Sequence, residues 1–175
     1  MEQTELIKAC KANSYKAQIA VYELYKDMLY TVSSRIIGND ADAQDVVHDT
    51  FIKAFKSIST VSDESSLGSW LKRIVINQSL GFLKKNNRIK WVTLDKEIPE
   101  KIEVHSMPNL QIDNVMNAMG KLKDKYRIII VLYLIEEYSH REIAQKLELN
   151  ESTVRNQYKR GKEMLANILK EYKLS

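Results

Sequence analysis

Glycine and proline are scarce in this sequence, with five glycines and two prolines among 175 residues. Because both residue types interrupt regular structure, their scarcity favours a few long helices over many short strands. Pro99 and Pro108 fall together in one segment that has no sustained apolar period. We therefore predict an all-α chain of two small helical domains, residues 1–87 and 112–175, joined by a flexible linker over residues 88–111.

The composition is that of a folded chain with a single thiol. Hydrophobic residues make up 44% and charged residues 29%, and the net charge of +4 permits an anionic partner without requiring one. Cys10 stands alone, so we expect neither an internal disulfide nor a cysteine-based metal cluster. The opening residues lack a signal-peptide pattern, and the longest apolar run, residues 128–135, is far shorter than the ~20 residues of a bilayer span. We therefore expect a cytoplasmic protein with no direct membrane insertion.

Three helices are predicted in the N-terminal domain. Residues 17–37 carry apolar side chains at helical spacing, and Asp40 or Asp42 is expected to cap the next helix. Residues 59–66 are polar and predict a loop, after which residues 67–87 resume the helical pattern. The second helix has an apolar stripe formed by Val47, Phe51, Ala54, Phe55 and Ile58.

The C-terminal domain is predicted to contain a buried helix ahead of a polar one. Residues 112–122 form a short amphipathic pattern, and residues 126–137 are apolar almost all round. The β-branched residues of the second segment could by themselves indicate a strand, but the sequence is helical on both sides. We therefore predict a buried central helix.

Residues 138–165 have the pattern of a helix-turn-helix. "YSHREIAQKL" begins with a capping box, in which Ser139 and Glu142 satisfy each other's backbone amides. "ELNE" supplies a short turn, and Asn150 is a suitable N-cap for the next helix. One face of that helix holds Val154, Tyr158, Gly161 and Leu165, which leaves other faces to polar residues. The spacing fits a DNA-reading helix, although an ordinary amphipathic surface helix has the same pattern.

A second cationic segment ends the N-terminal domain. The lysines and arginines of residues 72–90 are not interrupted by any acidic residue, and Trp70 lies just before them. Cationic groups beside an aromatic ring and amides suit a nucleic-acid backbone with exposed bases. The alternative is a solvated helix end, where Lys84 and Lys85 complement the helix dipole.

An acidic cluster precedes this segment. Asp42, Asp45 and Asp49 share a helical face, with His48 beside them. A carboxylate-histidine metal site is conceivable there, but it needs ligands from another helix, and no second acidic cluster of that kind is present. We therefore favour an acidic surface that faces solvent or a protein partner.

Three motifs in this order resemble the bacterial extracytoplasmic-function (ECF) sigma factors, which have two conserved domains. "DAQDVVHDTFIKAF" is similar to the family's core-binding helix, usually written around D-A-E-D-x-x-Q-E-x-F. "SWLKRIVINQSLGFLKK" resembles its W-L-x-R-I-A-x-N helix, and "LKDKYRIIIVLYLIEEYSHREIAQKLELNESTVRNQYKRGKEML" resembles its C-terminal domain. The chain departs from the family pattern at His48-Asp49, where Gln-Glu is usual, at Gly81, often Asp, at Lys123, usually Pro, and at Gly161, usually Ala.

The resemblance implies a dissociable subunit of bacterial RNA polymerase that recognises promoter DNA and is controlled by an anti-sigma factor. It implies no enzymatic activity, no cofactor and no metal. The residues it assigns to core polymerase are Asp42, Asp45, Val46, His48, Asp49 and Phe51. Those it assigns to the −10 element, whose non-template strand would be captured, are Trp70, Lys72, Arg73, Asn77, Lys84 and Lys85. Those it assigns to the −35 element are Ser152, Thr153, Arg155, Asn156, Gln157, Lys159 and Arg160.

Two other functions remain open on the residues alone. A stand-alone helix-turn-helix regulator with a ligand-sensing first domain would bind a palindromic operator without polymerase. A helical adaptor would bind only proteins and show no DNA affinity. An enzyme is the least favoured class, because no nucleophile-base spacing or phosphate loop is present and His48, His105 and His140 are scattered.

Overall fold

All regular structure in the chain is helical within the parts that are described. The computed structural model describes residues 3–62, 66–91 and 112–173, and these ranges contain no strand, which confirms the predicted all-α class. The chain divides into two compact units, residues 1–86 and 87–175. Most of the predicted linker, residues 92–111, lies outside the described residues. No helix in the described ranges has the length and apolar character needed to cross a membrane.

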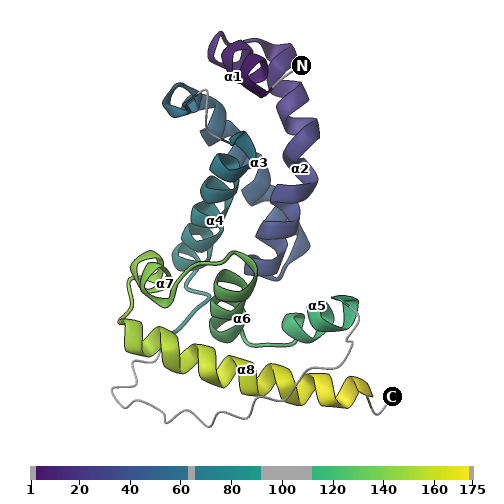
Figure 1. The fold of residues 1–175 in the computed structure, drawn as a ribbon, viewed down its shortest axis with the longest axis vertical. Coiled ribbons are helices and arrows are strands. Elements are labelled where there is room, and N and C mark those ends of the chain that lie inside the picture. The colour runs from purple at the N-terminus through teal and green to yellow at the C-terminus, as the bar shows by residue number, and fades with distance from the viewer. Residues whose placement is uncertain (1–2, 63–65, 92–111, 174–175) are drawn as a thin grey trace. The chain divides into compact units, whose positions relative to one another are not determined.

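The first unit is a three-helix bundle with a short helix packed on it. It consists of α1 (Gln3–Lys11), α2 (Tyr15–Ile37), α3 (Asp40–Lys56), the 3-10 turn η1 (Ile58–Thr60) and α4 (Leu67–Lys85). Each of α2, α3 and α4 packs against the other two, and α1 contacts α2 and η1 (Figure 1). The buried interior includes Leu29, Ile36, Val47, Leu71, Val75 and Leu83. Sequence periodicity did not predict α1.

The N-cap of α3 is not one of the residues that the sequence predicted. Gly38 ends α2 in the left-handed conformation, with φ 72°, which glycine adopts at little cost. Asn39, in an extended conformation, then caps α3, and its Oδ1 accepts from the Asp42 N–H at 3.0 Å. Asp40 and Asp42 lie in the first turn of α3, so the prediction that one of them is the N-cap was wrong. Their charges instead complement the positive end of the helix dipole.

The predicted polar loop after α3 is partly structured. The η1 turn covers its first residues, and both Ile58 and Val61 are buried. Ser66 caps α4, because its Oγ accepts from the Ser69 N–H at 3.3 Å. Residues 63–65 lie outside the described part of the chain.

The second unit is built around its last and longest helix. It consists of α5 (Ile112–Gly120), α6 (Asp124–Ile130), the π-helical segment η2 (Val131–Ile135), α7 (His140–Leu147) and α8 (Glu151–Lys173). Helix α8 packs against α5, α6 and α7 (Figure 1). Residues 128–132 are fully buried, so the predicted central helix is confirmed as helical and buried, although its second half widens into a π-helix.

Candidate nucleic-acid and partner interfaces

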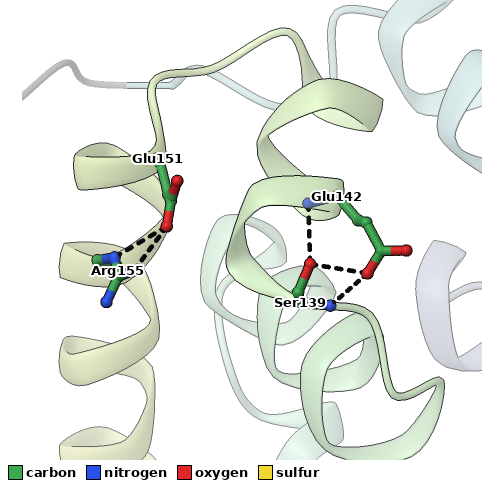
Figure 2. A network of polar contacts seen from close by, with 4 residues as sticks. All are labelled: Ser139, Glu142, Glu151 and Arg155. Atoms are coloured by element: carbon green, nitrogen blue, oxygen red, sulfur yellow. Dashed lines mark hydrogen bonds and ion pairs between the residues drawn. The ribbon is translucent and has the colours of Figure 1, made fainter.

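The helix-turn-helix begins at Ser139, whose side chain caps α7. The Glu142 N–H donates to Ser139 Oγ at 3.2 Å, and the Ser139 N–H donates to Glu142 Oε2 at 2.8 Å (Figure 2). The Ser139 hydroxyl donates to the same carboxylate oxygen at 2.7 Å. These hydrogen bonds lower the pKa of the Glu142 carboxyl, because they favour its charged form. The predicted capping box is therefore confirmed.

The turn between α7 and α8 is short and contains a left-handed residue. Glu148 has φ 57°, a conformation in which helix ends usually carry glycine. The Leu149 N–H donates to the Ala144 carbonyl at 2.9 Å, which closes the end of α7. Helix α8 begins at Glu151, directly after Asn150, whose carbonyl accepts from the Val154 N–H at 3.2 Å. The N-terminal end of α8 therefore lies beside α7.

The outward side of α8 carries an exposed polar and cationic surface. Gly161 marks the inward side, because a Cβ there would lie 3.1 Å from Ile130 of α6. Since successive helix residues turn by about 100°, Ser152, Arg155 and Lys159 lie on the opposite side. Ser152 and Arg155 are exposed, and Lys159 and Arg160 are half-buried. These groups are the donors that suit phosphate oxygens and base edges.

Three other predicted DNA contacts on α8 are buried. Thr153 is 1% exposed, Asn156 2% and Gln157 0%, which contradicts the expectation that they form part of a free surface. Gln157 lies one turn before Gly161 on the inward side, so its assignment as a base-reading residue was wrong. The hydroxyl of Thr153 and both amide atoms of Gln157 have no hydrogen-bond partner within the described residues. In the polar sequence around them, only Val154 and Tyr158 mark the inward side.

An aromatic cluster holds η2, α7 and α8 together. The Tyr133 ring stacks on His140 at 4.4 Å between centroids and 12° between planes, and the Tyr158 ring meets His140 edge-on at 5.1 Å. Burial lowers the pKa of His140, and the nearby charge of Arg155 lowers it further, so the neutral ring is favoured. Sequence reasoning treated His140 as isolated, because the three rings come together only when the helices pack.

Helix α4 presents its predicted DNA contacts on the solvent side. One stripe at helical spacing is formed by Trp70, Arg73, Asn77 and Lys84. Arg73, Asn77, Lys84 and the neighbouring Lys85 are exposed, and Trp70 is half-buried. Gly81 lies in the same stripe, where a Cβ would meet nothing within 4 Å. Lys72 points to a different side of the helix, so the structure does not bring it together with the other predicted contacts.

Helix α3 carries the acidic residues predicted to meet a protein partner. Asp45, His48 and Asp49 are exposed, and Asp42 is half-buried. Val46 and Phe51 are each only 4% exposed, which contradicts their assignment as direct contacts. The Phe51 ring packs against Tyr22 at 4.9 Å and Phe55 at 6.0 Å between centroids, because it belongs to the apolar stripe of the bundle.

One exposed apolar residue completes this acidic surface and was not predicted. Ile52 is 55% exposed, and it lies one turn beyond His48 and two turns beyond Asp45. The sequence signal was available, because Ile52 is an apolar residue outside the apolar stripe of α3. Among the described residues, no group of three or more His, Cys, Asp or Glu side chains is arranged to hold a metal ion. The exposed side of α3 therefore combines carboxylates with one apolar contact, a composition suited to a cationic protein surface.

Comparisons with known proteins identify both units. Residues 21–89 match the family description "Sigma-70 region 2", and residues 112–165 match "Sigma-70, region 4". The chain is 28% identical to the ECF RNA polymerase sigma factor SigW of Bacillus subtilis over 94% of this chain and 95% of that protein. It is 30% identical to the ECF RNA polymerase sigma factor SigE of Mycolicibacterium smegmatis over 83% of this chain and 58% of that protein.

Two solved structures share the fold. The sigma factor RpoE, in complex with the anti-sigma factor NepR from Bartonella quintana, has a TM-score of 0.54 at 21% identity, with 86% of this chain and 95% of that chain covered. CnrH, in complex with the cytosolic domain of CnrY, has a TM-score of 0.52 at 20% identity, with 97% of each chain covered.

Proposed function

Because the chain belongs to the ECF group of the sigma-70 family, which serves promoter-specific transcription initiation, we propose that it guides bacterial core RNA polymerase to promoters with two DNA elements. The observation that carries the proposal is the order of the two units, with region 2 followed by region 4 on one chain. Its relatives SigW and SigE are RNA polymerase sigma factors, and we propose no enzymatic activity for this chain. The proposed site of action is the cytoplasm, where polymerase works.

The second unit reads the −35 element through the N-terminal half of α8. An α-helix fits the major groove of B-DNA, and the turn after α7 leaves the start of α8 accessible to it. Arg155 is the candidate for a bidentate contact to guanine, with Lys159 beside it and Arg160 on a phosphate. Asn156 is also a candidate base contact, because it lies on the side of α8 away from Gly161. Its side chain is buried in the free chain, so DNA binding must expose it.

The first unit captures the non-template strand of the −10 element along α4. Trp70, Arg73 and Asn77 follow one another at helical spacing, so an aromatic ring, a guanidinium and an amide face the same strand. Stacking and hydrogen bonding of an extracted base can offset the few kcal/mol that extraction costs. Lys84 and Lys85 continue the surface as phosphate contacts. Strand opening then needs no nucleotide hydrolysis by this chain.

The exposed side of α3 docks on core polymerase, with Asp45, Asp49 and Ile52 as its main contacts. Docking holds the two DNA-binding units at a fixed separation, so binding of one raises the effective concentration of the other. We therefore expect weak promoter binding by the free chain. The sigma factor RpoE, which shares the fold, was solved in complex with the anti-sigma factor NepR, and we propose that this chain is likewise bound and silenced by an anti-sigma factor.

Reconstituted transcription tests the proposal. The purified chain is mixed with bacterial core polymerase and a library of promoters, and transcripts are sequenced. We expect transcripts that start at one class of promoter and are absent with core polymerase alone. Failure of the chain to associate with any bacterial core polymerase would refute the proposal.

A charge variant on α3 tests the docking surface. Asp49→Lys should weaken binding to core polymerase by about ten-fold or more, because like charges then meet across the interface. Asp27→Lys, the same change at an exposed position of α2 in the same unit, is the matched control. Equal effects of the two variants would contradict the assignment of α3. Binding is measured by fluorescence anisotropy of the labelled full chain.

A further inference from the structure

An ion pair on the outward side of α8 holds the side chain that is proposed to read guanine. Arg155 Nη2 lies 2.6 Å from Glu151 Oε1, and Arg155 Nε donates to the same oxygen at 3.2 Å (Figure 2). Glu151 is the first residue of α8 and Arg155 follows it by four positions. A glutamate four residues before a basic residue is the favourable orientation for such a pair on a helix.

The geometry of the pair leaves one edge of the guanidinium available. Glu151 occupies the edge that carries Nε, and Nη1 has no hydrogen-bond partner within the described residues. The edge formed by Nη1 and Nη2 has two parallel donors, which is the arrangement that a bidentate contact to O6 and N7 of guanine needs. The carboxylate therefore holds the guanidinium by one edge and leaves the edge formed by Nη1 and Nη2 for a base.

The exposure of the pair argues against a structural purpose. The side chains of Arg155 and Glu151 are 56% and 41% exposed, and exposed pairs contribute only about 0.2–1 kcal/mol to stability. An arginine that is already oriented loses less conformational freedom when it binds, which favours the base that fits its fixed direction. The negative charge of Glu151 also repels DNA phosphates, so non-specific binding is weakened while the correct contact is retained.

We propose that Glu151 is a positioning residue that sets the base preference of Arg155 at one position of the −35 element. The inference rests on the proposed function and deepens it, because it assigns the base contact to Arg155 and the orientation of the Arg155 side chain to Glu151. Removal of the Glu151 charge is expected to increase overall DNA affinity and to reduce discrimination at that one position.

The test uses holoenzyme, formed from the full chain and core polymerase, on promoters randomised over the −35 element. Base preferences are obtained by sequencing transcripts made with the wild-type chain, Glu151→Gln, Arg155→Ala and the double variant. Glu163→Gln, which removes one exposed carboxylate further along α8, is the matched control. Thermal unfolding by circular dichroism of each variant shows whether folding is preserved.

We expect Glu151→Gln to reduce the preference for guanine at one position by about two- to five-fold, corresponding to the strength of an exposed ion pair. Arg155→Ala should remove the preference at the same position, and the double variant should resemble Arg155→Ala. Glu163→Gln should leave all positions unchanged.

Other results overturn the inference. An unchanged or sharper preference in Glu151→Gln would show that the carboxylate does not aim Arg155. Additive losses at different positions in the double variant would show that the two residues act independently. Absence of promoter-specific transcripts with the wild-type chain would overturn the proposed function and this inference with it, whereas normal transcripts with unaltered preferences in Glu151→Gln overturn the inference alone.

Discussion

Helices α4 and α8 carry the two proposed DNA surfaces, and they differ in how those surfaces relate to the core. On α4, the polar stripe of Arg73, Asn77 and Lys84 lies on the solvent side, opposite the buried residues Leu71 and Val75. On α8, exposed Arg155 is surrounded in sequence by polar residues that are buried. A polar residue in a cationic helix is therefore not by itself a surface residue.

The difference arises from how clearly each helix marks its inward side. Helix α4 has apolar residues in every turn, so its polar stripe is defined by exclusion. The N-terminal half of α8 has only Val154 as an aliphatic anchor, and Thr153 and Gln157 occupy positions that apolar residues would otherwise fill. The comparison predicts that truncating the polar side chains of the α4 stripe changes DNA binding without changing stability. Substitutions of the buried polar residues on the inward side of α8 should change stability without changing DNA binding.

Asn156 offers the sharpest test of the comparison. If its burial is relieved on DNA binding, Asn156→Ala should weaken recognition at one or two −35 positions by about 1–3 kcal/mol and leave core binding intact. The measurement is transcription by holoenzyme on promoters randomised over the −35 element. Unchanged preferences together with a loss of stability would place Asn156 with the structural residues.

Substitution of Gln157 should change the stability of the second unit and leave the −35 base preferences unchanged. Gln157→Met replaces a buried amide without hydrogen-bond partners by an apolar side chain of similar length, and it should raise the unfolding free energy of the second unit by about 1–2 kcal/mol. Hydrogen exchange of peptides from α6 and α8 in urea reports this value. The −35 preferences should stay as they are, and a drop in stability would indicate that the amide is satisfied in solution.

Gly81 of α4 and Gly161 of α8 allow one substitution, glycine to alanine, to be compared at an open site and at a packed site. Gly81→Ala should stabilise the first unit by about 1 kcal/mol, because alanine is the better helix former and the site is open. Gly161→Ala should gain less, since its Cβ would lie 3.1 Å from Ile130 and 3.3 Å from Tyr126. Urea unfolding followed by tryptophan fluorescence in a Trp91→Phe background, where Trp70 is the remaining tryptophan, measures the first value. A larger gain at Gly161 would contradict the packing described for α8.

Lys84 tests the sequence-independent part of the α4 surface. Lys84→Ala should weaken promoter binding equally for all −10 sequences and make the dependence of log affinity on log salt shallower by about one phosphate contact. The affinity of holoenzyme for promoter DNA is measured at several salt concentrations. A change in base preference instead would indicate that Lys84 touches a base.

His140 gives the smallest expected effect. The folded-state pKa of His140 is lowered, by burial first and then by the charges of Arg155 and Lys162, with Glu151 opposing. The unfolded chain therefore binds more protons just below the ordinary value of about 6.5. The stability of the second unit is complete above that pH and decreases as the pH falls toward the folded-state value. Titration of the ring protons by NMR should give a midpoint below 6.5, and a midpoint at or above it would contradict the burial.

A structural feature that depends on hydrogen bonds within one helical turn was predictable from the sequence. The capping box of Ser139 and Glu142 was predicted because both partners lie within one turn of sequence. The apolar stripe through Phe51 correctly predicted the bundle, and the same stripe argued against using Phe51 as a contact to a partner. The cap of α3 was predicted at Asp40 or Asp42, because aspartate favours that position, whereas Asn39, directly after the left-handed Gly38, is the N-cap.

The amino-acid sequence by itself determined the helical class, the helix-turn-helix and the separation of acidic from cationic helices, because each depends on residues close together in the chain. Only the packed structure decided that Gln157 faces inward and that Tyr133, His140 and Tyr158 form one cluster. The physical reason is that the direction of a side chain around a helix depends on which neighbouring helices cover it. Polar character alone does not carry that information.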